Sequence, residues 1–400
     1  MVVYIVGTGV GGGLTLTKEA EKTILEAELL IGAERMLNPF LDLGKEMFCS
    51  YKPDEIAECI KGSNKNIVVV LMSGDCGFFS GTKKLLPLLD GIEIQIISGI
   101  SSAVYFCSKL GISYENMKYV SLHGRENNIA INVKTNEYCF FLLGGTQSAS
   151  EVCTRLCSYG MGNVHVHIGE NLGAENERII AGTAEDIARD VDNEFTEKLS
   201  VIVTRNPDYL KYIPSAISDD VFIRDKTPMT KAEVRNTAVA ALEICNNSVC
   251  WDIGSGSGSV SIEMAFRCPN GKVIAFEKDE LACELTTKNS MKFGCDNIQI
   301  IHGSFPDISE DTGVPDRVFI GGTSGKMKEI FDSIYQKNPD ALIVLTAVSL
   351  ETVEQAMRCF DAFNAECTVS QISVTRTKKV GSHTMLDALN PVFIIKGRLK

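Results

Sequence analysis

Seven consecutive residues in the second half of the chain have the types and spacing of a cofactor-binding loop. The run Asp252-Ile253-Gly254-Ser255-Gly256-Ser257-Gly258 follows an apolar stretch and precedes a helical pattern. Glycine lets the backbone turn sharply and approach a ligand closely, because it carries no Cβ atom. In open α/β sheets, ligands bind beyond the carboxyl ends of the strands. The sequence therefore predicts a nucleotide-like cofactor at this loop.

Two acidic residues beside the loop favour one cofactor over another. Glu277 ends the next predicted strand, 23 residues after Gly254, which is close to the ~20-residue spacing of a carboxylate that holds ribose hydroxyls. Asp252 stands just before the first glycine, where it would repel the pyrophosphate of a dinucleotide. It suits the cationic methionine end of S-adenosylmethionine. A dinucleotide, and a tight turn that needs glycine only for packing, stay open as alternatives.

Loops of small residues also follow the predicted strands of the first half. The opening loop, residues 7–13, satisfies G-x-G-x-x-G, but no acidic residue ends a second strand about 20 residues further on, which disfavours a dinucleotide there. Five more loops lie at residues 73–79, 98–102, 122–125, 143–146 and 169–173. So many loops at strand ends indicate a lined cleft rather than one isolated turn.

Alternating strands and helices must position these loops. In the second half we expect strands at 248–253, 272–276, 298–301, 316–320, 341–345, 366–374 and 392–396, with helices at 257–267, 279–293, 326–336 and 350–363. In the first half we expect strands at 2–6, 67–72, 93–97, 118–121, 139–143, 164–169, 178–182 and 199–204, with helices at 17–27, 81–89 and 100–110. The second pattern predicts a parallel sheet covered on both faces, closed by an antiparallel pair.

Proline spacing marks a boundary between the two halves. Pro207, Pro214 and Pro228 predict a linker at 206–225 that packs on a domain, between a first domain at 1–205 and a second at 226–400. The first domain should consist of two lobes, about 1–114 and 115–205, with a cleft between them.

Composition excludes several classes of protein. The chain has 400 residues, of which 44% are hydrophobic and 22% charged, as in globular proteins of two or three domains. Its net charge of −12 argues against a general partner of nucleic acid or anionic membrane. The apolar runs are too short to span a bilayer, and the start does not read as a signal peptide. Fourteen scattered cysteines without a CxxC motif indicate reduced thiols in a cytoplasmic protein, with no metal site.

Particular segments of the chain resemble two known families. The first half resembles the tetrapyrrole methylases, and within them the CbiE branch of cobalamin biosynthesis, through the opening loop and SGDCGFFSG, SGISSAVYF, SLHGR, LLGGT and GENLGAENERI. The second half resembles the decarboxylating precorrin methyltransferases called CbiT, through DKTPMTKAEVRN, WDIGSGSGSVSIEMA, VIAFEKD, FIGGTSGK and GSHTMLDALNPVFII. The segments follow the order of a CbiE–CbiT fusion. Three residues depart from the family pattern: Val10 and Cys76 stand where proline is common, and Thr346 where asparagine is expected.

The resemblance implies an α/β fold and two methylations of one corrin precursor. A two-lobed tetrapyrrole methylase domain would precede a Rossmann-like class I methyltransferase domain with a seven-stranded, mostly parallel sheet. The second half would methylate carbon 15 of (cobalt-)precorrin-6B and remove its ring C acetate, and the first would methylate carbon 5 of (cobalt-)precorrin-7, giving (cobalt-)precorrin-8. A corrinoid or cofactor carrier or sensor without turnover is the alternative, and an NAD(P)-dependent oxidoreductase is a third reading. The resemblance also implies a homo-oligomer, a tetramer through the second domain.

Carried over residue by residue, the resemblance implies one S-adenosylmethionine site in each half. The second-half residues are Thr230, Asp252, Gly254, Ser255, Gly256, Ser257, Gly258, Glu277 and Ser304. Those of the first half are Gly74, Asp75, Phe78, Ser101, Ser102, Leu143 and Asn171. Candidates for contact with the polycarboxylate tetrapyrrole are His123, Arg125, Arg376, Lys378 and His383. Thr230, Ser101 and Ser102 could instead cap the helices that follow them. No residue stands out as a strongly basic catalyst.

Overall fold

The chain folds into two compact units. The structure, a computed structural model, describes residues 1–11, 15–123, 127–144, 147–190, 200–213, 215–308 and 312–400. The first unit comprises Met1–Glu126, Glu137–Thr154 and Asn163–Pro207, and the second comprises Asn127–Asn136, Arg155–Gly162 and Asp208–Lys400. No helix in these described ranges has both the length and the apolar character needed to cross a membrane. Whether the halves are separable domains with the boundaries expected above stays a prediction.

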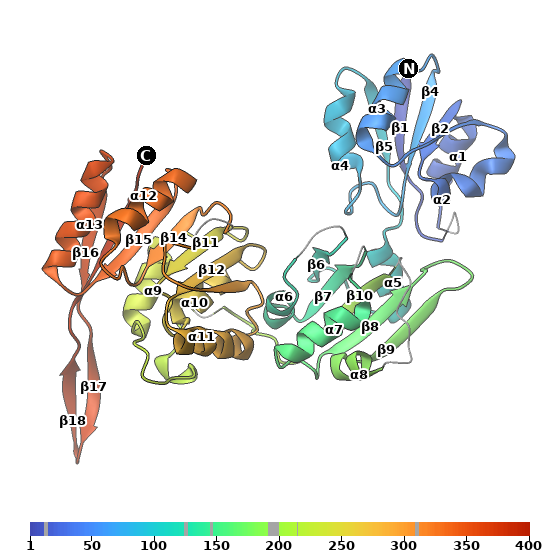
Figure 1. Cartoon of the computed structure of the whole chain (residues 1–400). Helices are drawn as coiled ribbons and strands as arrows, with labels where there is room; N and C mark the ends of the chain where they lie inside the picture. Colours follow the sequence, from blue (N-terminus) through green and yellow to red (C-terminus); the bar gives the residue numbers. More distant parts are fainter. Residues whose placement is uncertain (12–14, 124–126, 145–146, 191–199, 214, 309–311) are drawn as a thin grey trace. The chain divides into compact units, whose positions relative to one another are not determined.

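The first sheet of unit 1 has five parallel strands in the order β3-β2-β4-β1-β5 (Figure 1). The strands are β1 Val2–Gly7, β2 Leu29–Gly32, β3 Glu46–Cys49, β4 Ile67–Met72 and β5 Glu93–Ile97. The helices are α1 Lys18–Glu26, α2 Glu34–Leu37, α3 Pro53–Gly62, α4 Thr82–Leu85 and α5 Ser102–Leu110. Strands β1 and β4 are almost continuously apolar, because successive side chains enter cores on opposite faces.

The second sheet of unit 1 is mixed, in the order β6-β7-β10-β8-β9. Its strands are β6 Lys118–Ser121, β7 Tyr138–Leu142, β8 His165–Glu170, β9 Arg178–Thr183 and β10 Ser200–Arg205. Helices α6 Ala130–Thr135, α7 Ala149–Ser158 and α8 Ala184–Arg189 accompany them in the sequence. Only β6 and β7 run parallel, and the other neighbours are antiparallel. The five strands expected in this part of the sequence are therefore confirmed.

Unit 2 is built on a seven-stranded sheet in the order β13-β12-β11-β14-β15-β19-β16, in which β19 alone runs antiparallel to both neighbours. The strands are β11 Val249–Ile253, β12 Lys272–Glu277, β13 Ile298–His302, β14 Arg317–Ile320, β15 Leu342–Ala347, β16 Cys367–Ile372 and β19 Val392–Arg398. The helices are α9 Ala232–Ala241, α10 Ser259–Arg267, α11 Glu280–Phe293, α12 Met327–Lys337 and α13 Leu350–Ala362. This confirms the predicted seven-stranded, mostly parallel sheet.

Helices cover both faces of this sheet because its strands alternate their side chains between two cores. Trp251 and Ile253 of β11 enter the core that α12 and α13 share. Cys250, which precedes Trp251 on the same strand, enters the opposite core with α9 and α10. The linker region packs on this second core through Ile217 and Phe222, whereas Tyr212 is 78% exposed.

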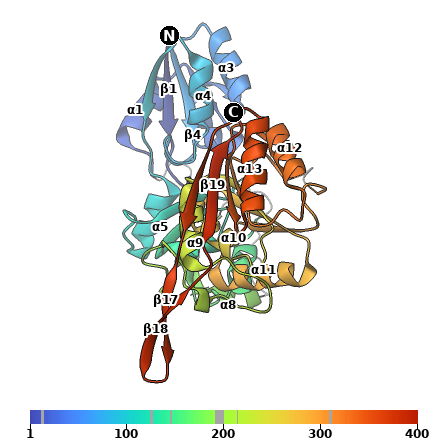
Figure 2. The ribbon, with the colours of Figure 1, turned by 90° about the vertical axis from the view of Figure 1, so that its left-hand side faces the viewer.

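A two-stranded hairpin, absent from the sequence prediction, interrupts the last antiparallel pair of unit 2. Strands β17 Thr375–Val380 and β18 His383–Ala388 pair only with each other among the described strands. Two views show the hairpin extending away from the seven-stranded sheet (Figures 1 and 2). Leu386, which lies opposite Thr377 in this hairpin, is 79% exposed. Residues 376–379, which include the substrate-contact candidates Arg376 and Lys378, form part of this hairpin.

Candidate functional site

Unit 2 has a cavity of about 870 Å³ at the carboxyl edge of its five parallel strands. Residues directly after β11, β12, β13, β14 and β15 line it, as does the segment before α9. Eight of the predicted cofactor residues contribute to this lining: Thr230, Asp252, Gly254, Ser255, Gly256, Ser257, Glu277 and Ser304. Thr346, one of the departures from the family pattern, lines it too. The five loops thus converge on one cleft.

Gly258 is the predicted residue that does not line this cavity, and its geometry explains why the position is a glycine. It caps α10 with a φ of 75°. A Cβ atom there would lie 2.6 Å from Cγ2 of Thr286. Both the left-handed conformation and the close approach to α11 therefore require glycine. Its predicted contact with a cofactor stays a prediction.

Asp252 is fully buried at the end of β11. The Ser261 hydroxyl donates a hydrogen bond to Oδ2, while Oδ1 has no hydrogen-bond partner. Burial raises the pKa of the carboxyl group to about 7, and the nearby charge of Glu277 adds to the rise. An unpaired buried carboxylate oxygen in a cleft is suited to a cationic ligand group.

Glu277 is oriented by backbone amides of the glycine loop and of its own strand end. Its Oε2 atom accepts from the N–H of Gly256 at 2.8 Å. Its Oε1 atom accepts from the N–H groups of Lys278 and Asp279 at 2.9 and 3.0 Å. A carboxylate offers about four acceptor positions, so the group can still accept from a diol such as a ribose.

Two serines complete the polar lining of this cleft. The hydroxyl groups of Ser255 and Ser257 are buried without a hydrogen-bond partner. Buried polar atoms are ordinarily paired, and those that are not indicate a missing water or ligand. Together with Asp252 they provide acceptors and donors at the glycine loop, which fits the amino acid end of S-adenosylmethionine.

Unit 1 has a second cavity, of about 600 Å³, between the strand ends of its two sheets. All seven predicted cofactor residues of this half line it: Gly74, Asp75, Phe78, Ser101, Ser102, Leu143 and Asn171. His123 and the opening-loop residues 8–11 also contribute. Arg125 lies outside the described residues. Sequence reasoning missed Arg35, which lines the cavity from α2 and carries no local signal of that position.

Asp75 and Ser101 shape the loops of this cavity. Asp75 accepts from the N–H groups of Gly77 at 2.8 Å and Gly99 at 3.1 Å. Ser101 caps α5 by accepting from the N–H of Val104 at 3.2 Å. The capping interpretation of Ser101 is therefore confirmed, and the same residue lines the cavity.

Two departures from the family pattern are accommodated here. Cys76 is buried, its thiol donates to the carbonyl groups of Ile5 and Ile97, and burial raises its pKa to about 11. The N–H of Val10 donates to the Thr15 hydroxyl at 2.7 Å.

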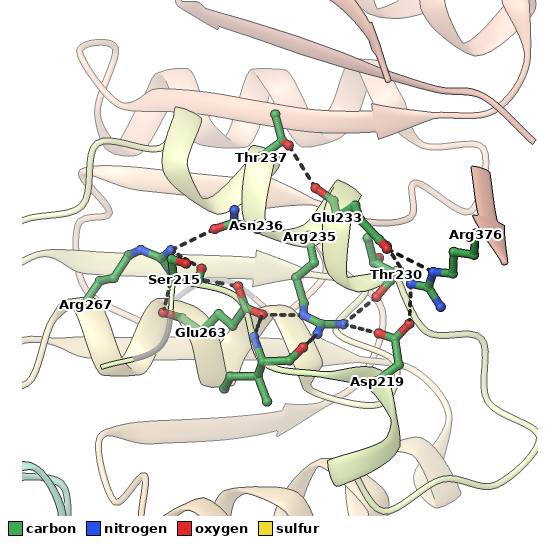
Figure 3. Close-up of polar contacts among 11 residues, drawn as sticks. Ser215, Asp219, Thr230, Glu233, Arg235, Asn236, Thr237, Glu263, Arg267 and Arg376 are labelled. Atoms are coloured by element: carbon green, nitrogen blue, oxygen red, sulfur yellow. Dashed lines mark hydrogen bonds and ion pairs between the residues drawn. The ribbon is translucent and has the colours of Figure 1, made fainter. Parts of the chain in front are cut away.

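Three of the substrate-contact candidates lie on the hairpin and do not line the cavity of unit 2. Lys378 and His383 belong to β17 and β18. Arg376 forms ion pairs with Glu233 and Asp219 (Figure 3). The root of the hairpin does reach the cavity, through Val374, Leu389 and Asn390.

Comparisons with known proteins match the two halves of the chain separately. Residues 2–188 match a family model described as "Tetrapyrrole (Corrin/Porphyrin) Methylases", and residues 220–397 match one described as "Precorrin methyltransferase domain". A protein of Pyrobaculum calidifontis named "Probable cobalt-precorrin-6B C(15)-methyltransferase (decarboxylating)" is 35% identical over 46% of this chain and 96% of its own length. The Salmonella typhimurium "Cobalt-precorrin-6B C(15)-methyltransferase (decarboxylating)" is 33% identical over 45% of this chain and 94% of its own length.

One solved structure is also similar to part of this chain. The precorrin-6Y C5,15-methyltransferase structure from Geobacter metallireducens is 35% identical, covers 47% of this chain and 98% of its own, and has a TM-score of 0.44. The sheet, the glycine loop and the cleft define unit 2 as a class I methyltransferase domain. The chain belongs to the precorrin methyltransferase family, and its first half is a tetrapyrrole methylase domain.

Proposed function

We propose that this chain is a bifunctional corrin-ring methyltransferase of cobalamin biosynthesis. Unit 2 methylates carbon 15 and decarboxylates the ring C acetate of (cobalt-)precorrin-6B, and unit 1 methylates carbon 5 of (cobalt-)precorrin-7. The observation that carries the proposal is the cleft of unit 2, where polar atoms of Asp252, Ser255 and Ser257 at the glycine loop are buried without a hydrogen-bond partner. Cytoplasmic location is part of the proposal, since none of the fourteen cysteines forms a disulfide.

The residues of the cleft need to position groups rather than move protons. When bound, S-adenosylmethionine supplies an electrophilic methyl group that a ring carbon attacks, so that a C–C bond forms as the C–S bond breaks. Departure of the acetate carboxyl group as CO₂ returns its bonding electrons to the substrate ring, so no protein base is required. Asp252 and Glu277 would orient the donor through its amino and ribose groups. Such positioning lowers the barrier to methyl transfer.

The charges around the two cavities suit a polycarboxylate substrate. Lys226, Lys231 and Lys278 line the cavity of unit 2, and Arg35 lines that of unit 1. Acidic residues line the same cavities, namely Asp225, Asp252, Glu277 and Asp279 in unit 2 and Asp75 and Glu175 in unit 1. The cations would therefore act as individual partners of substrate carboxylates.

Transfer of label from methyl-labelled S-adenosylmethionine to precorrin tests this function. Mass spectrometry of products from metal-free and cobalt-loaded precursor, run in parallel, should find two added methyl groups and one lost CO₂ with the better substrate. Gly256→Arg should abolish the decarboxylated product, because the new side chain enters the cleft beside Pro228. Binding of the cofactor without label transfer would support the carrier or sensor instead, and binding of NAD(P) would support the oxidoreductase.

We also infer two cofactor sites per chain, one in each cavity, and a homo-oligomer formed through unit 2. The hairpin supports the second inference, because Val380, Met385 and Leu386 are 51%, 54% and 79% exposed, and exposed apolar side chains gathered on one element mark interaction surfaces. Calorimetry should give two cofactor equivalents per chain.

Sedimentation tests the assembly. The double variant Met385→Ser, Leu386→Ser should sediment as a smaller particle than the wild type. Leu41→Ser, which removes a 60% exposed leucine of unit 1, is the matched control and should not change the particle size. An unchanged particle in the hairpin variant would contradict the assembly through this surface.

A further inference from the structure

One wall of the unit 2 cleft is a segment with almost no regular structure. Residues 219–231, here called the cleft-wall segment, contain only the short 3-10 helix Asp219–Val221. Its last seven residues, from Asp225 to Lys231, line the cavity. The wall lies directly against the glycine loop, since a Cβ atom on Gly256 would be 3.2 Å from the carbonyl oxygen of Pro228. Side chains from elsewhere must therefore fix its position.

Arg235 holds the wall from α9. This guanidinium group is fully buried and donates to the carbonyl oxygen of Thr230 at 2.6 Å and to Asp219 at 3.1 Å (Figure 3). Its Nε atom pairs with Glu263 at 2.7 Å, and it also donates to the carbonyl of Ile217. Arg235 thus ties both ends of the cleft-wall segment to the helical layer.

Asn289 of α11 holds the middle of the same segment. It accepts from the N–H of Ile223 at 2.8 Å and donates to the carbonyl of Ile223 at 3.1 Å. It also donates to the carbonyl of Ser257 at 3.0 Å. The wall and the glycine loop are therefore joined through one fully buried amide.

Arg376, on the hairpin, forms ion pairs with Asp219 and Glu233, one at the start of the cleft-wall segment and one just after it. Its guanidinium reaches Asp219 at 3.0 Å, on the carboxylate oxygen that Arg235 does not use. It pairs with both carboxylate oxygens of Glu233, at 2.9 and 2.5 Å. Glu233 lies in the first turn of α9, directly after the wall. Two arginines, one buried and one on the hairpin, therefore share one carboxylate (Figure 3).

We propose that Arg376 is a positioning residue for the cofactor cleft of unit 2, acting through Asp219 and Glu233 on the cleft-wall segment. Asp219 is the first residue of the cleft-wall segment, and Glu233 lies two residues after its end. Loss of Arg376 therefore removes the bonds that link both ends of the segment to the hairpin. The wall can then shift against the glycine loop, which weakens cofactor binding without touching the reacting atoms. The inference rests on the proposed function, in that this cleft binds S-adenosylmethionine.

Trp251 gives a probe of this cleft alone. It is the one tryptophan of the chain and directly precedes Asp252 on β11. Titration of the full-length protein with S-adenosylmethionine, followed by Trp251 fluorescence, should show that Arg376→Gln raises Kd about fivefold to tenfold. Steady-state assays should show the same rise in the KM for S-adenosylmethionine, with kcat for decarboxylation within twofold of the wild type. Arg376→Lys should restore part of the affinity, since lysine keeps the charge but not the paired geometry.

Lys379→Gln is the matched control, because Lys379 is an exposed cation three residues further along the same strand. Its Kd should stay within twofold of the wild type. The proposal is overturned if Arg376→Gln also stays within twofold, if both variants weaken binding equally, or if the weakening appears only when the particle size changes. A fall in kcat with unchanged KM would also overturn it. Absence of any binding by the wild type would overturn the proposed function and this inference together.

Discussion

Asp252 combines complete burial with an acceptor oxygen that has no partner. Its pKa is raised from 3.8 to about 7, mainly by burial. Between these two pH values the folded protein holds a proton at Asp252 that the unfolded chain has lost. The stability that this proton contributes is complete below pH 3.8 and is lost as the pH rises through about 7.

Asp252→Asn should therefore flatten the dependence of stability on pH. Relative to the wild type, its free energy of unfolding should rise by roughly 3 kcal/mol between pH 5 and pH 8, because the variant has no carboxyl group to ionise. Urea unfolding followed by Trp251 fluorescence measures both proteins. Parallel pH profiles for wild type and variant would show that this carboxyl group is not responsible.

At the scale of the element, Gly258 decides how closely α10 approaches α11. Gly258→Ala introduces both a strained φ and a contact of 2.6 Å with Thr286, so unit 2 should lose about 2–4 kcal/mol of stability. Gly325→Ala is the control, since Gly325 has a φ of 83° but no atom within 4 Å of its added Cβ. The control should lose only about 1 kcal/mol in the same unfolding measurement. Equal losses would mean that close packing contributes nothing.

The sequence predicted those elements whose pattern is local. The strands of the seven-stranded sheet are short apolar runs between glycine-rich loops, and each appears within a few residues of its expected place. The elements expected in the first half do not include β2, β3 or the helices α2, α3, α6, α7 and α8. Strands β2 and β3 are only four residues long, and β2 follows a helix almost directly. The hairpin was not predicted for a different reason. Nearly all residues of β17 and β18 are exposed, so their sequence lacks the alternation of apolar and polar residues that marks a half-buried strand.

The candidate site also contains both residues that the sequence marks and residues that only the folded structure reveals. Asp252, the glycine loop and Glu277 are marked by spacing along the chain, and the structure brings them to one cleft. Arg235 looked like an ordinary helical residue, and its position depends on Asp219, Glu263 and the wall, which only the folded chain brings together. A cation between Val234 and the apolar Ala238–Val239 pair was the one signal that could have found it.

For the whole molecule, two cavities in different units predict two independent chemistries. The double variant Asp252→Ala, Glu277→Ala should lose carbon-15 methylation and decarboxylation together, with each change weakening cofactor binding about 5–150-fold. It should still methylate carbon 5 when given the decarboxylated intermediate. Asp75→Ala with Ser101→Tyr should instead let the once-methylated, decarboxylated intermediate accumulate. Product masses distinguish these species by one methyl group. Loss of both activities in a folded first variant would contradict independent sites.

Separate expression of residues 1–215 and 216–400 tests the predicted boundary. We expect both fragments to fold, with the second less stable than in the whole chain by about 1–3 kcal/mol. The reason is Asp296, which is buried and accepts from the N–H groups of Ile129, Ala130 and Ile131. The cut removes these donors, the ion pair of Asp296 with Arg155 and Ile131 from the core of unit 2, so buried contacts are lost. Circular dichroism and urea unfolding measure both properties, and two molten fragments would contradict the boundary.

The seven-stranded sheet of unit 2 cannot be completed before β19 has been synthesised. This strand lies between β15 and β16, and its residues Ile394 and Ile395 complete the two cores on opposite faces of the sheet. The ribosome makes β16 and the hairpin before β19, so β15 and β16 lack their shared partner strand until residues 392–398 have been synthesised. An interrupted chain that stops before Val392 would leave one edge of β15 and the whole of β16 unpaired, with two incomplete cores. Unpaired edges of this kind pair readily with other chains. Nascent chains of this protein are therefore vulnerable to aggregation until β19 has been made.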